Sequence, residues 1–406
     1  MKTRLAVAAT AMAMVGAAVV GLAAPGQAAS PTTDPAQAAR LGAGWLARQA
    51  QADGSFQLLS NSYSDTATAA LAFAAAGVGQ SQFQGAMTYL HDHVSDFLSA
   101  GGGDDPGTLG LVIMAVVVDG QDPTNFNGQN LVSVLKATRD KSSPGLYGSK
   151  DPSFDGVTRQ SLALMGLAAA GSNDAPAVQW LQTQQCPDKG WQAYRSDTAA
   201  PCDPTDLTNF TGEDTNSTAV ASEALKALAA VPPQGNPLDW LKGAQNTNGG
   251  FGVLVGNATD ANSTGLVLQA IVAGGENPAQ GRWLTTNGSS PDSALLALQI
   301  GCDGAAADRG GFAFQPDSSG ALKPNGFATA QAVPGAASKP FPLTGAQPTQ
   351  AAPTVDCSPA TTTTTAAVAT PTTQAARPAT VAAPQAAPAA NSPVAAAVSA
   401  TPPFAG

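Results

Sequence analysis

Two charged side chains, Arg159 and Glu223, lie within segments that are otherwise apolar and have the spacing of helices. A charge buried on a packing face is normally paired, because removing an isolated charge from water is costly. Each of the two is therefore either paired with a neighbour or lines an internal cavity. If they face a cavity, Arg159 and Glu223 are the residues that we expect a ligand to contact.

A second set of polar residues opens the apolar helical segments. They are Ser64, Asp104, Asp155, Asp214, Asp260 and Asn325. Ser, Asp and Asn are preferred helix N-caps, because their side-chain oxygens accept backbone N–H hydrogen bonds. Capping alone would explain all six positions.

The alternative is an acidic mouth that binds cations or sugar hydroxyls, with Asp214 and Asp260 among its carboxylates. Aromatic residues on the nearby loops would then supply stacking surfaces: Trp191, Tyr194, Tyr147 and Phe251. The helix dipole weakens a bare cation site at such a place, since helix N-termini favour anions. Both interpretations remain open at this point.

The sequence gives little support for metal chemistry. The chain has two histidines, His91 and His93, which are two positions apart and point to different sides of a helix. A metal ion needs three or four converging ligands, and no cysteine is near the histidines in sequence. We therefore expect surface histidines, no bound metal and no cofactor.

The four cysteines indicate disulfides in an exported chain. Cys186 and Cys202 flank one loop, and pairing them leaves Cys302 and Cys357 to tie the start of the tail to the last repeat. Four cysteines allow three pairings, and we favour this one.

Both ends of the chain differ in composition from the middle. Lys2 and Arg4 precede an uncharged apolar run and then small residues, which predicts a signal peptide over residues 1–29. An uncleaved membrane anchor is the alternative. Residues 345–406 are rich in Ala, Pro and Thr and nearly free of charge, so we expect a disordered stalk there. We expect a secreted, extracellular protein that is either free or associated with the cell wall. We expect no transmembrane span in the mature chain.

Residues 34–340 are repetitive. Glycine turns, most of them with an aromatic residue, precede apolar helical segments, as in 53–56, 189–191, 248–252 and 309–314. The segment after each turn is rich in small apolar residues on nearly all faces, which indicates burial all round. The segment before the turn is amphipathic and ends in Gln or Arg. Six buried helices inside six half-exposed helices predict one all-α domain that closes into a double ring.

The alternation of W-L-x-x-x-Q, D/N-G-G-F and D-x-x-x-T-A-x-A resembles the αα-toroid repeat of squalene cyclases and protein prenyltransferase β subunits. Cobalamin carriers of the transcobalamin type share that toroid. The resemblance covers about residues 36–338 and implies an α6/α6 toroid. It implies little about function, because one fold hosts several chemistries.

The chemistries known on this toroid need residues that can be checked in the sequence. Asp104 and Asp105 are followed by Pro106 and lack the first Asp of the cyclase D-x-D-D cluster. The inner segments offer few aromatic side chains, Phe73 and Phe327, for stabilising a carbocation. A diphosphate-binding D-D-x-x-D motif, the Asp/Cys/His zinc set of prenyltransferases and a C-G-E-Q thioester are also missing.

These observations predict a non-catalytic binding protein for a small molecule, a glycan or a surface protein. A terpene cyclase or prenyltransferase-type enzyme is the alternative, and a structural cell-envelope protein is the second alternative. A net charge of −10 excludes an extended contact with nucleic acid. A cavity lined by Arg159 and Glu223 would favour the binding protein, whereas a closed, alanine-filled centre would favour the structural protein.

Overall fold

The computed structural model describes residues 32–59, 62–139, 145–148, 156–345 and 347–357. The predicted signal peptide and residues 358–406 of the predicted stalk lie outside the described residues. The described residues form helices and a few isolated β-bridges, with no β-strand. None of their helices has the length and apolar character needed to cross a membrane.

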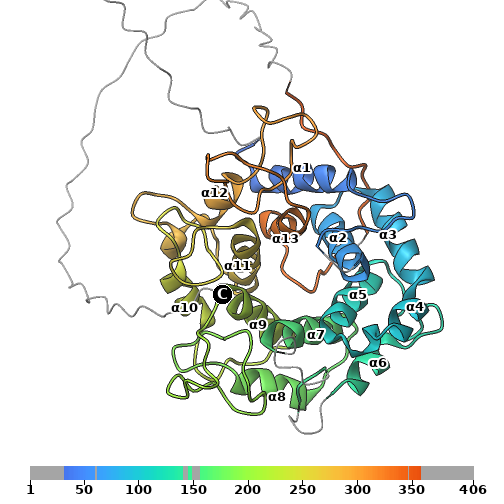
Figure 1. Cartoon of the computed structure of the whole chain (residues 1–406), viewed down its shortest axis with the longest axis vertical. Helices are drawn as coiled ribbons and strands as arrows, with labels where there is room; N and C mark the ends of the chain where they lie inside the picture. The colour runs from blue at the N-terminus through green and yellow to red at the C-terminus, as the bar shows by residue number, and fades with distance from the viewer. Residues whose placement is uncertain (1–31, 60–61, 140–144, 149–155, 346, 358–406) are drawn as a thin grey trace, which may run out of the picture.

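Six helices surround the centre of the molecule in a closed ring (Figure 1). Their bounds are α2 Ser62–Ala76, α5 Pro106–Val118, α7 Val157–Ala169, α9 Thr215–Ala227, α11 Ala261–Ala273 and α13 Gly326–Ala336. Each contacts the next in this order, and α13 contacts α2, so the ring is complete. Most of their residues are buried, as expected for helices that are covered on all sides.

An outer layer of helices surrounds this ring (Figure 1). The outer helices are α1 Pro35–Ala47, α3 Gln80–Asp92, α4 Val94–Ser99, α6 Leu131–Ala137, α8 Ala175–Thr183, α10 Pro237–Ala244 and α12 Pro291–Leu296. Helices α3 and α4 meet at His93 and together form one outer segment, so the described residues contain six inner and six outer segments. The predicted double ring is confirmed.

A repeated hydrogen bond joins the glycine turn to the inner helix that follows it in five of the six repeats. In four repeats a threonine hydroxyl accepts the backbone N–H of the turn aromatic residue, at 2.9–3.1 Å: Thr66 from Phe56, Thr218 from Trp191, Thr264 from Phe251 and Thr329 from Phe312. In the third repeat, Gln160 Oε1 accepts the N–H of Tyr147 at 2.9 Å. All five aromatic rings are fully buried. The turn aromatic residues thus anchor the loops in the core.

Close helix contacts in the inner ring depend on glycine. A Cβ on Gly110 of α5 would lie 2.2 Å from the carbonyl oxygen of Leu162 in α7, and a Cβ on Gly265 of α11 would lie 2.7 Å from the carbonyl oxygen of Gln331 in α13. Real side chains do not approach a backbone atom so closely. The two helix pairs can therefore be this near only without a side chain at these positions.

We expect Gly110→Ala and Gly265→Ala each to lower the free energy of unfolding by about 1–3 kcal/mol, because the added methyl group overpacks the interface. This loss would oppose the gain of about 1 kcal/mol that alanine normally gives in a helix. Gly243→Ala in α10 is the control, since a Cβ there meets nothing within 4 Å. Urea unfolding curves measure all three variants. Equal stability of Gly110→Ala and Gly243→Ala would contradict the close packing.

The folded region extends beyond residue 340, the boundary that the sequence predicts. The segment after α13 turns back across the ring, and Gln350 binds the first repeat: its carbonyl oxygen accepts the N–H groups of Gly79 and Gln80 at 2.8 and 3.0 Å. Arg40 donates to Gln350 Oε1 at 2.6 Å. The prediction of a disordered stalk from residue 345 is therefore wrong for 347–357, because long-range contacts hold a segment that lacks large apolar residues.

Two disulfides are present, Cys186–Cys202 and Cys302–Cys357. This is the pairing that the sequence favours. The second disulfide fixes the end of the segment 338–357, which we call the return segment, to the loop that follows α12.

Candidate functional site

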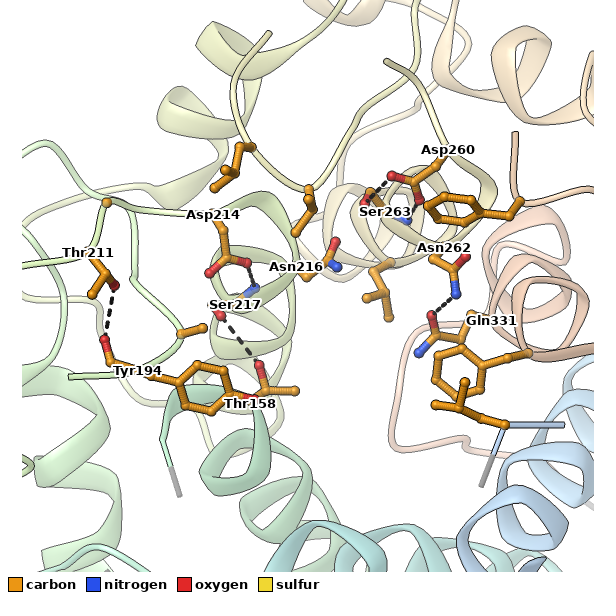
Figure 2. A pocket seen from close by; sticks show the side chains of 18 of the residues that line it. Thr158, Tyr194, Thr211, Asp214, Asn216, Ser217, Asp260, Asn262, Ser263 and Gln331 are labelled. Atoms are coloured by element: carbon orange, nitrogen blue, oxygen red, sulfur yellow. Dashed lines mark hydrogen bonds between the residues drawn. The ribbon is translucent and has the colours of Figure 1, made fainter. Parts of the chain in front are cut away.

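A pocket of about 670 Å³ lies at the end of the ring where the inner helices begin. It is bounded by the first turns of α9, α11 and α13 and by the loops between the helix layers (Figure 2). Large apolar side chains at its rim are 36–72% exposed: Leu59, Tyr194, Val253, Leu254 and Phe314. Most of the large apolar side chains that the described surface exposes are thus gathered at one opening, which is typical of a binding site.

Three of the predicted caps form the polar wall of this pocket. Asp214 Oδ1 accepts the N–H of Ser217 at 2.7 Å, Asp260 Oδ1 accepts that of Ser263 at 2.7 Å, and Asn325 Oδ1 accepts that of Ala328 at 2.8 Å. The predicted capping role is confirmed for these three residues. All three also line the pocket. Figure 2 shows Asp214 and Asp260 there, and a ligand-binding role for these two remains a prediction.

Burial changes the proton affinity of the two aspartates. Desolvation raises the pKa of Asp214 to about 6, although hydrogen bonds from Ser217 act in the opposite direction. The pKa of Asp260 is also raised, mainly by desolvation. These pKa shifts weaken the predicted acidic mouth, because protonation of Asp214 near pH 6 removes one of its charges.

The caps of the first two inner helices differ from the prediction. Asp105 rather than Asp104 caps α5, because Pro106 occupies the first helical position and Asp105 Oδ1 accepts the N–H of Thr108. Ser64 lies inside the first turn of α2 rather than before it. Asp155 lies outside the described residues.

The predicted stacking surfaces are mostly buried. Trp191 is fully buried, and its indole N–H donates to the carbonyl oxygen of Leu181 at 2.9 Å, so it does not line the pocket. Tyr147 and Phe251 are also fully buried. The prediction that these rings face a ligand is wrong, because the turn aromatic residues pack under the helices. Tyr194, at 42% exposure, does line the pocket.

A smaller cavity of about 200 Å³ continues from the pocket toward the centre of the ring. The two spaces share four lining residues, Thr158, Leu266, Phe327 and Gln331, so they lie next to each other. We call the larger space the mouth, the smaller one the inner chamber, and both together the axial cavity. The centre of the ring is therefore neither closed nor filled with alanine.

The lining residues follow the helical repeat. On four inner helices they stand two, six and nine positions after the N-cap: Thr158, Leu162 and Met165 on α7; Asn216, Val220 and Glu223 on α9; Asn262, Leu266 and Gln269 on α11; Phe327, Gln331 and Pro334 on α13. These spacings place three residues of each helix on one face. At 1.5 Å per residue, the third level lies about 13 Å below the caps.

Glu223 reaches the deepest level of the axial cavity. Its side chain is 2% exposed and lines the inner chamber, as the sequence anticipates for a cavity-facing charge. Its Oε2 accepts the backbone N–H of Phe341 in the return segment at 3.0 Å. Burial raises the pKa of Glu223 to about 8, and the Phe341 bond acts in the opposite direction. Glu223 is therefore mostly protonated at neutral pH.

Arg159 does not line the axial cavity. Its Nε lies 3.9 Å from Asp105 Oδ1 of the neighbouring helix α5, and its stem packs beside Gly107. The structure therefore separates Arg159 from Glu223. Arg159 is paired with a neighbouring side chain, which is the alternative to a cavity position that the sequence leaves open.

Four further residues line the axial cavity and are not predicted from the sequence: Gln269, Gln331, Phe314 and Leu59. Alignment of the inner segments on their caps would have revealed Gln269 and Gln331.

The described residues offer one group of three side chains close enough to share a metal ion, Cys186, Cys202 and Glu213. Both sulfur atoms are in the disulfide and are not available as thiolate ligands. The group therefore fits a disulfide beside a half-buried carboxyl group rather than a metal centre.

No protein-family model and no curated protein matches this chain. Solved structures do match. A type II terpene cyclase from Scytonema is 12% identical and has a TM-score of 0.52 over 75% of this chain and 98% of the cyclase chain. The fold is an αα-toroid. An Actinoplanes protein, 18% identical, and an unsaturated glucuronyl hydrolase from a Bacillus species, 12% identical, each match 75% of this chain and 98% and 96% of their own, both with TM-scores of 0.49. Identities this low show the toroid alone.

Proposed function

We propose that this chain is a non-catalytic binding protein that holds a small, largely apolar molecule in its axial cavity. The observation that carries this proposal is that the mouth and the inner chamber share four lining residues, with volumes of about 670 and 200 Å³. Pockets for small molecules usually measure about 300–1,000 Å³ and combine an apolar lining with a few polar groups. The exposed apolar rim gives such a ligand a first contact surface.

The proposal includes export of the chain. The predicted signal peptide supports it, and the disulfides Cys186–Cys202 and Cys302–Cys357 are compatible with an oxidising extracellular environment. A protein outside the cell with an apolar cavity is suited to carry or capture a molecule that is poorly soluble in water.

A tryptophan that blocks the axial cavity tests the binding proposal. Leu266 lines both the mouth and the inner chamber, so Leu266→Trp should fill the junction between them. We expect N-phenylnaphthylamine to bind the unchanged protein saturably, with one site by fluorescence titration. Leu266→Trp should weaken that binding at least about tenfold, since it removes most of the buried contact area.

Val231→Trp is the matched control, because Val231 is 75% exposed and does not line the cavity. We expect this variant to bind the dye as the unchanged protein does. Equal dye affinity in all three proteins would place the dye outside the axial cavity and contradict the proposal. Native mass spectrometry of the protein purified from its own host would then identify any ligand that it retains.

A terpene cyclase is the second candidate, and Glu223 is the observation that favours it. A protonated carboxyl group in an apolar cavity is in place to donate a proton. Protonation of an alkene, however, needs a strong acid, and a carboxyl group with a pKa of about 8 is a weak one. Incubation with geranylgeranyl dihydroxybenzoate, the substrate of the Scytonema cyclase, tests this candidate. A cyclised product would favour the enzyme over the binding protein.

A further inference from the structure

The floor of the axial cavity carries two polar side chains, Glu223 of α9 and Gln269 of α11. Both stand nine positions after the aspartate that caps their helix, so these neighbouring helices present them at the same level. Glu223 is 2% and Gln269 1% exposed. The side chains around them in the inner chamber are mainly apolar, among them Leu162, Met165 and Val220.

The hydrogen-bonding capacity of this pair is not fully used. Gln269 Oε1 is buried and has no hydrogen-bond partner among the described residues. Glu223 Oε2 accepts the N–H of Phe341, so the neutral carboxyl group still has its O–H to donate. A buried polar atom without a partner costs about 1–3 kcal/mol, which is unusual unless a ligand or water supplies the bond.

We propose that Glu223 and Gln269 bind the hydroxyl group of an apolar alcohol at the floor of the axial cavity. The carboxyl group of Glu223 donates to the hydroxyl oxygen, and the side-chain amide of Gln269, turned so that Oε1 faces the inner chamber, accepts the hydroxyl proton. The rest of the molecule lies against the apolar level formed by Leu162, Val220 and Leu266. This inference rests on the proposed function, because it names the ligand class of the same cavity.

Other head groups fit the floor less well. A carboxylate ligand would present two acceptors to Gln269 Oε1, which is itself an acceptor. An ammonium group would need an ionised Glu223, and two buried charges lose more hydration than their attraction restores in most such sites. An alcohol needs no ionisation and offers one acceptor and one donor, which matches what the pair lacks.

The size of the inner chamber favours a compact group beside the hydroxyl. Its volume is about 200 Å³. An apolar cavity of about 150 Å³ is large enough to bind benzene. Benzyl alcohol, toluene and benzylamine are therefore suitable probes, since they share one ring and differ in the group that meets Glu223 and Gln269.

Methyl NMR of the full chain, with ¹³C-labelled methionine, tests the inference. Met165 lines the inner chamber, whereas Met87 lies on the outer helix α3. We expect benzyl alcohol to shift the Met165 signal saturably and to leave that of Met87 in place. Two additional hydrogen bonds should make benzyl alcohol bind at least about tenfold tighter than toluene.

Gln269→Met removes the acceptor at similar volume and should reduce the preference for benzyl alcohol over toluene to about twofold or less. Gln184→Met makes the same replacement at a buried glutamine that lines neither the mouth nor the inner chamber, and should keep the preference. The methionine spectrum shows in each case whether the variant is folded.

Equal binding of toluene and benzyl alcohol by the unchanged protein would overturn the alcohol site and leave the proposed function standing. Tighter binding of benzylamine would also overturn it, in favour of an ion pair with Glu223. If no probe shifts the Met165 signal, the alcohol site and the proposed function both fail. A preference for benzyl alcohol that survives Gln269→Met would show that Gln269 is not the acceptor.

Discussion

We expect the protein to be more stable at pH 5 than at pH 8, and Glu223→Gln to remove a large part of that difference. Burial raises the pKa of Glu223 to about 8 in the folded protein. In the unfolded chain a glutamate has a pKa of about 4.3. Between these values the folded state binds the proton and the unfolded state releases it, so stability falls as the pH rises from about 4.3 to 8.

The size of the effect follows from the same pKa values. Each unit of difference corresponds to about 1.4 kcal/mol, so ionisation of Glu223 lowers the free energy of unfolding at pH 8 by on the order of 3–5 kcal/mol. Three other carboxyl groups, one buried and two half-buried, act in the same direction. Their pKa values are raised to about 6 for Asp214, about 6 for Asp292 and about 7 for Glu213, in each case mainly by desolvation.

Glutamine is neutral at every pH and keeps an oxygen that accepts the N–H of Phe341. We therefore expect Glu223→Gln to raise the free energy of unfolding at pH 8 by several kcal/mol, within that same 3–5 kcal/mol range, and to leave it nearly unchanged below pH 4.5. Urea unfolding across this pH range measures the effect. Asp104→Asn, at an exposed position, is the control and should keep the pH dependence of the unchanged protein. Loss of stability in Glu223→Gln at pH 8 would show that Glu223 is ionised and held by its surroundings.

The toroid could be predicted because its signals are local and repeated. The aspartates that cap α9 and α11, and the threonines four positions later, recur with the same spacing as the helices that they begin. The sequence predicts that the first inner helix begins at Ser64, whereas it begins two residues earlier, at Ser62, and Thr66 is the threonine that binds the turn. Ser60, Ser62 and Ser64 alternate at this point of the sequence, and the hydrogen bond of Thr66 to Phe56 is not visible there.

The site was predicted less completely, because its residue identities depend on which side of a helix faces the axis. Glu223 was found because a charge is conspicuous in an apolar segment, but Arg159, equally conspicuous, lies beside Asp105 on the neighbouring helix. Gln269 was missed because an amide in a helix carries no such signal. The contact of Phe341 with Glu223 joins positions 118 residues apart, which no local pattern reveals.

Removal of the Cys302–Cys357 disulfide should destabilise the protein more than removal of Cys186–Cys202. The first joins residues 55 apart and the second residues 16 apart. In the chain-entropy model, the longer loop corresponds to about 4 kcal/mol and the shorter one to about 3 kcal/mol. Double alanine variants of each pair, compared by urea unfolding, measure the two contributions.

The two disulfides should differ even more in their effect on the floor of the axial cavity. Cys357 ends the return segment, and Phe341 of that segment donates its N–H to Glu223. Loss of Cys302–Cys357 frees one end of the segment, so we expect hydrogen exchange of the Phe341 amide to become at least about tenfold faster. The variant without Cys186–Cys202 is the matched control and should protect this amide as the unchanged protein does. Unchanged protection in both variants would show that Gln350 and its partners in the first repeat hold the segment without the disulfide.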